Sequence, residues 1–133
     1  MSTEQNKAVV HRFIKEVLKN QNYALVDELL AHDYVNHLAP GGREGFKQFN
    51  TMLRSALPDL KIHISMEHLI AEGDYVVARI TFHVTNAGKE ATGSYLSEYR
   101  LANGKIVEDW PPSDTAALLQ QVGVTLPSGP GER

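Results

Sequence analysis

The sequence of 133 residues contains no cysteine, which excludes disulfides, thiol nucleophiles and cysteine-ligated metal centres. No segment approaches the roughly 18 apolar residues of a membrane-spanning helix, so no membrane partner is expected. Charges of both signs are spread along the chain to a net charge of −3, without the basic stripe typical of nucleic-acid binding. The N-terminus is polar rather than an apolar signal segment. These absences favour a cytoplasmic protein without a nucleic-acid partner.

Hydrophobic residues make up 42% of the sequence and charged residues 22%, a composition that is typical of one globular domain. We expect a single domain over residues 1–125. The segment 126–133 is rich in proline, glycine and serine, and we expect it to form a flexible tail.

Helical periodicity dominates the first part of the chain. Ser2 and Gln5 have the spacing of a capping box, which predicts a helix over residues 3–19. A short second helix follows, then a mixed segment without a clear period, and then a third helix over residues 43–56 that Pro58 ends. The sequence therefore begins with three helices.

After residue 58 the hydrophobic period changes to two, which indicates strands. Turn signals at Gly73-Asp74, at Asn86 and at Asn103-Gly104 divide this region into four strands. We expect an antiparallel meander over residues 60–110 and a closing helix over residues 115–121, capped by Asp114. This order is typical of an α+β fold in which helices cover one face of a curved sheet and leave a concave pocket.

A carboxylate, Asp109, stands near the end of the last expected strand, beside the only tryptophan, Trp110. Prolines at positions 111 and 112 prevent this strand from continuing in a central ladder. A carboxylate under a tryptophan would have its pKa raised by desolvation, which suits a general acid or base. The alternative is a salt-bridged aspartate near the sheet edge.

The order and spacing of several motifs over roughly residues 5–123 resemble those of the SnoaL-like polyketide cyclases, a branch of the nuclear-transport-factor-2-like superfamily. The motifs are Tyr34-Val35-Asn36-His37, Gly45-Phe46, Leu57-Pro58-Asp59, Gly73-Asp74-Tyr75-Val76-Val77-Ala78-Arg79, Arg100, Gly104-Lys105-Ile106-Val107-Glu108, Trp110, Asp114 and Gln121-Val122-Gly123. The resemblance implies a cone-shaped α+β fold with helices on a curved antiparallel sheet, a small apolar pocket, no cofactor, and frequent homodimers. It implies fold more firmly than activity, because related folds host unrelated functions.

The sequence departs from the patterns that this resemblance brings with it. Cyclases of the family use a pocket aspartate two residues after a histidine, and those positions fall here on Pro111 and Asp109. Limonene epoxide hydrolases, on a related fold, use a tyrosine, an asparagine and an arginine that fall on Tyr34, Asn36 and Arg79. The two aspartates of those hydrolases fall on Thr81 and Pro111. Neither set of catalytic residues is therefore complete in this sequence.

We expect Asp109 to move a proton. The resemblance implies that His37 lies in the pocket, where it could act as a proton shuttle, and that Arg79 points inward, where Asp109 would be its natural partner. Alternation alone favours another reading, in which Arg79, Thr81 and His83 form a solvated strand face. The expected substrate-binding residues are Tyr34, Asn36, Phe46, Phe49, Leu53, Thr81, His83 and Trp110. The phenylalanines at helical spacing would also suit an ordinary core, and no histidine spacing suggests a metal site.

The favoured function is cofactor-free proton transfer, such as aldol cyclisation or isomerisation, on a small apolar carbonyl compound. The alternatives are a small-ligand-binding protein without catalysis and an epoxide-hydrolase-like enzyme. An inward Arg79 would turn the stripe Val76, Ala78, Ile80 and Phe82 outward. Such an exposed apolar stripe predicts a homodimer through the sheet.

Overall fold

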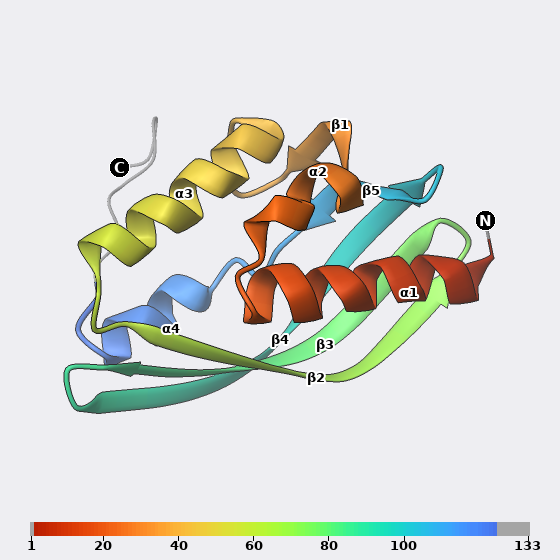
Figure 1. The fold of residues 1–133 in the computed structure, drawn as a ribbon. Helices are drawn as coiled ribbons and strands as arrows, with labels where there is room; N and C mark the ends of the chain where they lie inside the picture. The colour runs from red at the N-terminus through yellow and green to blue at the C-terminus, as the bar shows by residue number, and fades with distance from the viewer. Residues whose placement is uncertain (1, 125–133) are drawn as a thin grey trace.

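The structure is a computed structural model that describes residues 2–124. The expected tail at 126–133 lies outside these described residues. Helices pack against one face of a curved five-stranded sheet with strand order β1-β5-β4-β3-β2 (Figure 1). The elements are α1 (Thr3–Arg12), the π-helix η1 (Phe13–Lys19), the 3-10 helix η2 (Tyr23–Leu25), α2 (Val26–Leu29), β1 (Leu30–Asn36), α3 (Gly42–Ala56), β2 (Lys61–Glu72), β3 (Tyr75–Asn86), β4 (Lys89–Ala102), β5 (Lys105–Trp110) and α4 (Thr115–Gln121).

The structure confirms the predicted α+β fold and the antiparallel meander. The pairs β2–β3, β3–β4 and β4–β5 are all antiparallel. Asn103 and Gly104 both have positive φ, at 53° and 80°, as a type I′ hairpin turn requires. The predicted capping box is present as well, since Ser2 and Gln5 exchange hydrogen bonds at the start of α1. Local sequence signals therefore fix this part of the fold.

The prediction of four strands is wrong, because β1 adds a fifth strand at the sheet edge. It pairs parallel with β5, matching Leu30 with Ile106 and Asn36 with Asp109. Buried side chains in β1 do not alternate, since Leu30 and Tyr34 are buried with intermediate and exposed positions between them. The register of the pair is irregular over the same stretch. A strand without alternation, whose partner lies far along the chain, leaves no local signature.

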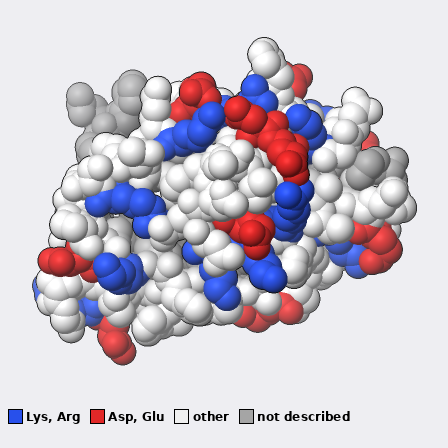
Figure 2. Space-filling model, viewed as in Figure 1, with Lys and Arg blue, Asp and Glu red and all other residues white. Residues whose placement is uncertain are grey.

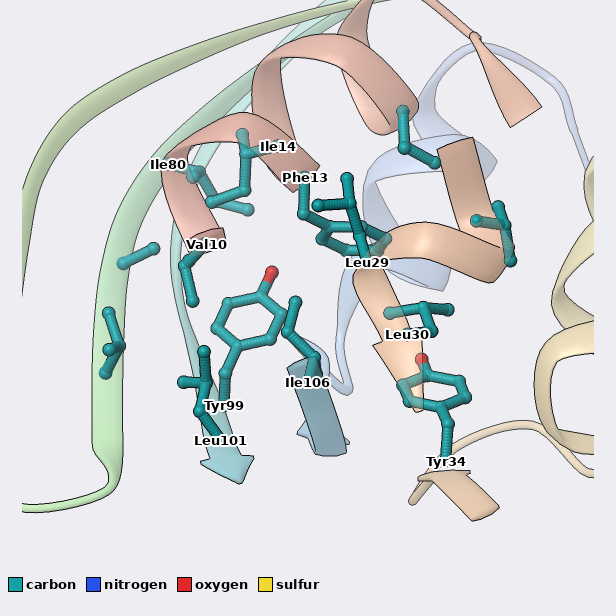
Figure 3. Close-up of a cluster of buried hydrophobic side chains, with 14 of the residues drawn as sticks. Val10, Phe13, Ile14, Leu29, Leu30, Tyr34, Ile80, Tyr99, Leu101 and Ile106 are labelled. Atoms are coloured by element: carbon teal, nitrogen blue, oxygen red, sulfur yellow. The ribbon is translucent and has the colours of Figure 1, made fainter. Parts of the chain in front are cut away.

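The core lies between α1, η1 and the inner face of the sheet. Apolar side chains of the helical segment, Val10, Phe13, Ile14 and Val17, are fully or almost fully buried. Figure 3 shows Val10, Phe13 and Ile14 facing Ile80 and Tyr99 of the sheet. The ring of Phe13 meets the ring of Tyr99 edge-on, with centroids 6.0 Å apart. Helix and sheet thus share one continuous apolar layer.

The predicted orientation of β3 is also wrong. Val76, Ala78 and Ile80 face the helices and are buried, so Arg79 between them faces outward and is exposed. The physical reason is that helices cover the face of the sheet that carries the apolar side chains. The exposed stripe on which the dimer prediction depended is therefore inside the molecule.

In the part of the chain that the structure describes, no helix is long and apolar enough to cross a membrane.

The core predicts unequal effects at two phenylalanines. Phe13 is fully buried, whereas Phe49 on α3 is 38% exposed. We expect Phe13→Ala to lower the free energy of unfolding by about 3–5 kcal/mol, because it leaves a cavity. Phe49→Ala, as the matched control, should cost about 1 kcal/mol, the average for a single substitution. Urea denaturation measures both, and equal losses would contradict this placement of the core.

Candidate functional site

One extra residue in β5 turns Asp109 toward the helices. Ile106 and Asp109 are both buried although they lie three positions apart, which strict alternation along a strand forbids. In the pairing with β4, Glu108 faces Arg100 and Ile106 faces Leu101, so one residue of β5 between them has no partner. Such a bulge re-aims the side chains that follow it. Asp109 therefore faces inward.

The carboxylate of Asp109 is held by a chain of hydrogen bonds from β1. The hydroxyl of Tyr34 donates to Oδ2 of Asp109 at 2.9 Å. The side-chain amide of Asn36 donates to the Tyr34 hydroxyl at 3.2 Å. Oδ1 of Asn36 accepts from the backbone N–H groups of Leu38 and Ala39, at 2.8 and 3.0 Å. The turn after β1 thus fixes Asn36, which orients Tyr34, which orients the carboxylate.

The second carboxylate oxygen, Oδ1 of Asp109, is buried and has no hydrogen-bond partner among the described residues. Burial raises the pKa of Asp109 to about 7, although the hydrogen bond from Tyr34 opposes this shift. Burial and the neighbouring carboxylate also raise the pKa of Tyr34 above its usual range, so Tyr34 remains a hydrogen-bond donor. Asp109 is thus poised to gain or lose a proton near neutral pH.

Tyr99 is a further polar residue at this site that sequence reasoning missed. It lies opposite Asp109 in the β4–β5 ladder and is buried. Its hydroxyl accepts a hydrogen bond from Ser97 at 3.2 Å. Burial, followed by the charge of Asp109, raises its pKa. The alternating pattern of β4 could have shown that Tyr99 points inward, but only the strand pairing brings it to Asp109.

His37 and Trp110 lie on the opposite face of the sheet from the Asp109 carboxylate. Nε2 of His37 is 2.8 Å from Oε2 of Glu108, and its ring stacks on Trp110 with centroids 4.8 Å apart. Arg100 binds the other oxygen of Glu108 at 2.5 Å. Only the backbone of His37 reaches Asp109, by donating its N–H to the carbonyl oxygen at 2.9 Å. The expected contact between His37 and the carboxylate, and the expected cover of Asp109 by Trp110, are wrong because neighbouring side chains point to opposite faces.

Arg79, Thr81 and His83 form the outer face of β3, as alternation alone indicated. Thr81 shares hydrogen bonds with Glu67 and Ser94, at 2.7 and 2.9 Å, and His83 contacts Thr92 at 2.8 Å. No ion pair among residues 2–124 joins Arg79 to Asp109. The expected inward Arg79–Asp109 pair is therefore wrong, and a half-buried strand with a polar outer face takes its place.

The expected apolar residues of α3 do not line a pocket around Asp109 among the described contacts, and Phe46 faces η1 and η2. Phe46 packs against Phe13 and Tyr23, with ring centroids 5.8 and 6.3 Å away. Leu53 is half-buried and Phe49 is partly exposed. Within the described residues, no three histidine, aspartate or glutamate side chains lie close enough to hold a metal ion. The structure thus joins Tyr34 and Asn36 to Asp109 and separates Arg79 and His37 from its carboxylate.

The buried carboxylate predicts a distinctive dependence of stability on pH. The pKa of Asp109 rises from 3.8 to about 7 on folding, so the folded state binds this proton more tightly than the unfolded state. Its contribution to the free energy of unfolding therefore falls as pH rises from about 4 to about 7 and stays constant above. Relative to Asp109→Asn, we expect wild type to lose on the order of 4 kcal/mol between pH 4 and pH 8. Denaturant titrations of both proteins measure this difference.

The matched control for this experiment is Asp33→Asn, which changes an exposed aspartate of β1. The difference between wild type and this control should stay nearly constant with pH. A constant difference for Asp109→Asn as well would contradict the raised pKa.

The comparisons with known proteins agree with this fold. The family described as SnoaL-like polyketide cyclase matches residues 8–122. A candidate polyketide cyclase from Bacillus cereus ATCC 10987 has a similar structure, with 26% identity, a TM-score of 0.77, and coverage of 95% of this chain and 87% of that chain. IdmH, a candidate polyketide cyclase from Streptomyces antibioticus, is similar at 23% identity and TM-score 0.74, with coverage of 90% and 99%.

The same fold also occurs with another described activity. AclR, a candidate hydroxylase from Streptomyces galilaeus, is similar at 20% identity and TM-score 0.72, with coverage of 92% of this chain and 98% of that chain. Among curated proteins, no significant match is found. The family match extends over most of the sequence and agrees with the α+β architecture. The chain therefore belongs to the SnoaL-like polyketide cyclase family.

Proposed function

We propose that this protein is a cofactor-free enzyme in which Asp109 transfers a proton to and from an apolar carbonyl compound, as in aldol cyclisation or isomerisation. One observation carries the proposal. Oδ2 of Asp109 is held by Tyr34, whereas the buried Oδ1 has no partner among the described residues. A buried polar atom without a partner costs free energy, and such groups concentrate where function requires them.

In the proposed reaction, the ionised Oδ1 removes a proton from the carbon next to the substrate carbonyl. The electron pair of the broken C–H bond then forms the enolate. In an isomerisation the proton returns to another carbon, and in an aldol closure the enolate carbon attacks a second carbonyl, whose oxygen takes the proton from Asp109. A base with a pKa near 7 suits both steps, because it exchanges protons readily at neutral pH.

The neighbouring residues have defined parts in this proposal. Tyr34 and Asn36 orient the carboxylate through their hydrogen bonds. Tyr99 already accepts a hydrogen bond from Ser97, so its own O–H is a donor for an oxygen that becomes negative. Charges of both signs are interspersed on the face shown in Figure 2, which favours a substrate without strong charge. His37 and Arg79 lie on the outer face of the sheet and take no part in the proposed reaction.

A small-ligand-binding protein without catalysis is the second candidate. Access to the carboxylate is the first reason for this candidate. The side chains of Asp109 and Tyr34 are only 5% and 2% exposed, and the two described surface hollows are lined by other residues. The family's aspartate position holds Pro111. An epoxide-hydrolase-like enzyme is a weaker candidate. One of the two positions where such enzymes have an aspartate holds Thr81 here, and Thr81 lies on the outer face of the sheet.

The catalytic proposal predicts exchange of carbon-bound hydrogen. We expect the protein to accelerate replacement of the α-hydrogens of 2-tetralone by deuterium in D₂O, followed by NMR. The rate should rise about tenfold per pH unit below 7 and level off above, because the ionised carboxylate is the base. Asp109→Asn should lower the rate by roughly 100-fold or more, the usual contribution of a general base.

Asp33→Asn serves again as the control and should exchange at the wild-type rate. Wild-type exchange rates in Asp109→Asn would contradict the role of this carboxylate. Binding of 2-tetralone by wild type without any acceleration would favour the non-catalytic binding protein.

We further propose that a second copy of the chain covers the outer face of the sheet. The basis is no longer the β3 stripe, which is buried, but four exposed apolar side chains on the outer face, Val35, Ile70, Tyr75 and Leu96. Arg79 and Glu98 lie on the same face and offer opposite charges for a two-fold contact. Exposed apolar groups gathered on one face are typical of interaction surfaces.

Leu96 is the residue that tests this contact, because its side chain is 61% exposed on the outer face of the sheet. We expect wild type to sediment as a dimer at micromolar concentration and Leu96→Asp to sediment as a monomer of unchanged fold. In a dimer of this variant, the two introduced aspartates would place like charges in the contact that the two Leu96 side chains form in wild type. Met52→Asp on α3, which belongs to the helical layer on the other side of the sheet, is the matched control; Met52 is 44% exposed, and this variant should remain dimeric. A monomeric wild type would rule out the contact.

A further inference from the structure

We infer that α3 is a hinged cover over the Tyr34–Asp109 pair, held closed by exposed ion pairs to Asp27, and that it opens to admit a ligand. The identity of that ligand rests on the proposed function. The opening itself is a property of the chain that can be measured without any substrate. The inference follows from four features of the structure: the buried pair, the packing of α3, its ends and its ties.

The buried pair is closed to a small molecule in this conformation. Both side chains are at least nine-tenths buried, yet Oδ1 of Asp109 lacks a partner. One described hollow lies between the end of α3 and the start of β2, and the other lies between α1 and β2. Neither is lined by Tyr34 or Asp109. A ligand therefore reaches Oδ1 only when part of the covering layer moves.

The packing of α3 makes it the part most easily moved. Although it has 15 residues, none of its side chains is buried, whereas α1 and η1 contribute Val10, Phe13 and Ile14 to the core. Its aromatic contacts to the body of the protein come from Phe46. Segments with few buried apolar contacts open at a lower free energy than the core.

The first turn of α3 lies against the backbone of Tyr34. A Cβ atom built on Gly42 would be 3.3 Å from the carbonyl oxygen of Tyr34. Figure 3 shows Tyr34 at the side of the core cluster nearest the pale yellow ribbon of α3. Displacement of this helix would uncover Tyr34, and with it the carboxylate that Tyr34 holds, before it uncovers the residues packed beneath η1.

Both ends of α3 have the character of hinges. Gly41 and Gly42, just before and at its first position, have φ values of 96° and 59°, a region that residues with a side chain rarely adopt. At the other end, Pro58 follows Leu57 and prevents the helix from continuing. Short joints of this kind absorb the backbone rotations of moving elements.

Two ion pairs tie α3 to Asp27 of α2. Two further hydrogen bonds join α3 to the body of the protein, from Arg54 to the hydroxyl of Tyr23 and from Arg43 to the carbonyl oxygen of Leu30. Lys47 Nζ lies 3.2 Å from Oδ1 of Asp27, and Arg43 Nε lies 3.7 Å from the same oxygen. Arg43 also donates weakly to the backbone carbonyl of Asp27, at 3.4 Å. Exposed ion pairs contribute little to stability and are screened by salt. These two ion pairs therefore add a small, salt-sensitive contribution to the closed state.

Hydrogen exchange followed by mass spectrometry tests this cover. In wild type, we expect the amides of residues 45–56 to exchange much faster than those of β3 and β4, which report global opening. Asp27→Asn should accelerate exchange of residues 45–56 by about fivefold, the effect of losing two exposed ion pairs. The exchange of β3 and β4 should stay unchanged. Raising NaCl to 1 M should accelerate the same amides in wild type but not in the variant.

The neighbouring residue offers a matched control. Glu28 is also an exposed acid of α2 in an ion pair, but its partner is Arg12 of α1 rather than α3. Glu28→Gln should therefore leave exchange of residues 45–56 unchanged. Equal acceleration by both variants would overturn the assignment to Asp27, and exchange of α3 only together with β3 and β4 would overturn the cover itself.

Nitration by tetranitromethane tests whether the opening reaches the site. We expect Tyr34 to be nitrated faster in Asp27→Asn than in wild type. Tyr99, buried beside the same carboxylate but packed against Phe13, should be unaffected and serves as the internal reference. Acceleration at both tyrosines, or at neither, would overturn the inference. Because no substrate is involved, this result stands whether or not the protein proves to be an enzyme.

Discussion

The burial of one carboxylate, that of Asp109, is the constraint on which the rest of the site depends. A buried charge needs partners, and those that Asp109 has come from β1, through Tyr34 and Asn36. The edge strand, the turn that fixes Asn36, and the bulge of β5 all serve to place or hold that group. Burial raises the pKa of Asp109 to about 7 against the effect of the Tyr34 hydrogen bond, and Oδ1 has no partner among the described residues.

Local signals in the sequence predicted most of the fold. The helices, the three hairpins and α4 follow from hydrophobic period and turn residues, because these features depend on neighbours in the chain. The edge strand β1 could not be found this way, since its pairing with β5 joins residues about 75 positions apart and its burial does not alternate. Parallel pairs of this kind are set by the assembled domain.

The site was predicted in part. Asp109 stood out as a carboxylate beside two prolines, and the family resemblance pointed to Tyr34 and Asn36, which bind it or its partner. The same resemblance led to the wrong face for Arg79, where simple alternation of β3 gave the right one. His37 failed for a related reason, because one residue past Asn36 the side chain lies on the opposite face of the sheet. Family likeness and strand geometry therefore have to be weighed position by position.

The bulge in β5 has a consequence for how such a site changes during evolution. Asp109 faces inward because one residue of β5 between Ile106 and Glu108 has no partner in β4. If β5 paired with β4 without this bulge and kept all its residues, regular alternation from Ile106 onward would turn Glu108 inward and Asp109 outward, without any amino-acid replacement. Pro111, the position at which the family resemblance implies an aspartate, lies two residues further on, just beyond the end of β5. Which acidic side chain of β5 faces the helices is therefore a matter of register as much as of residue type.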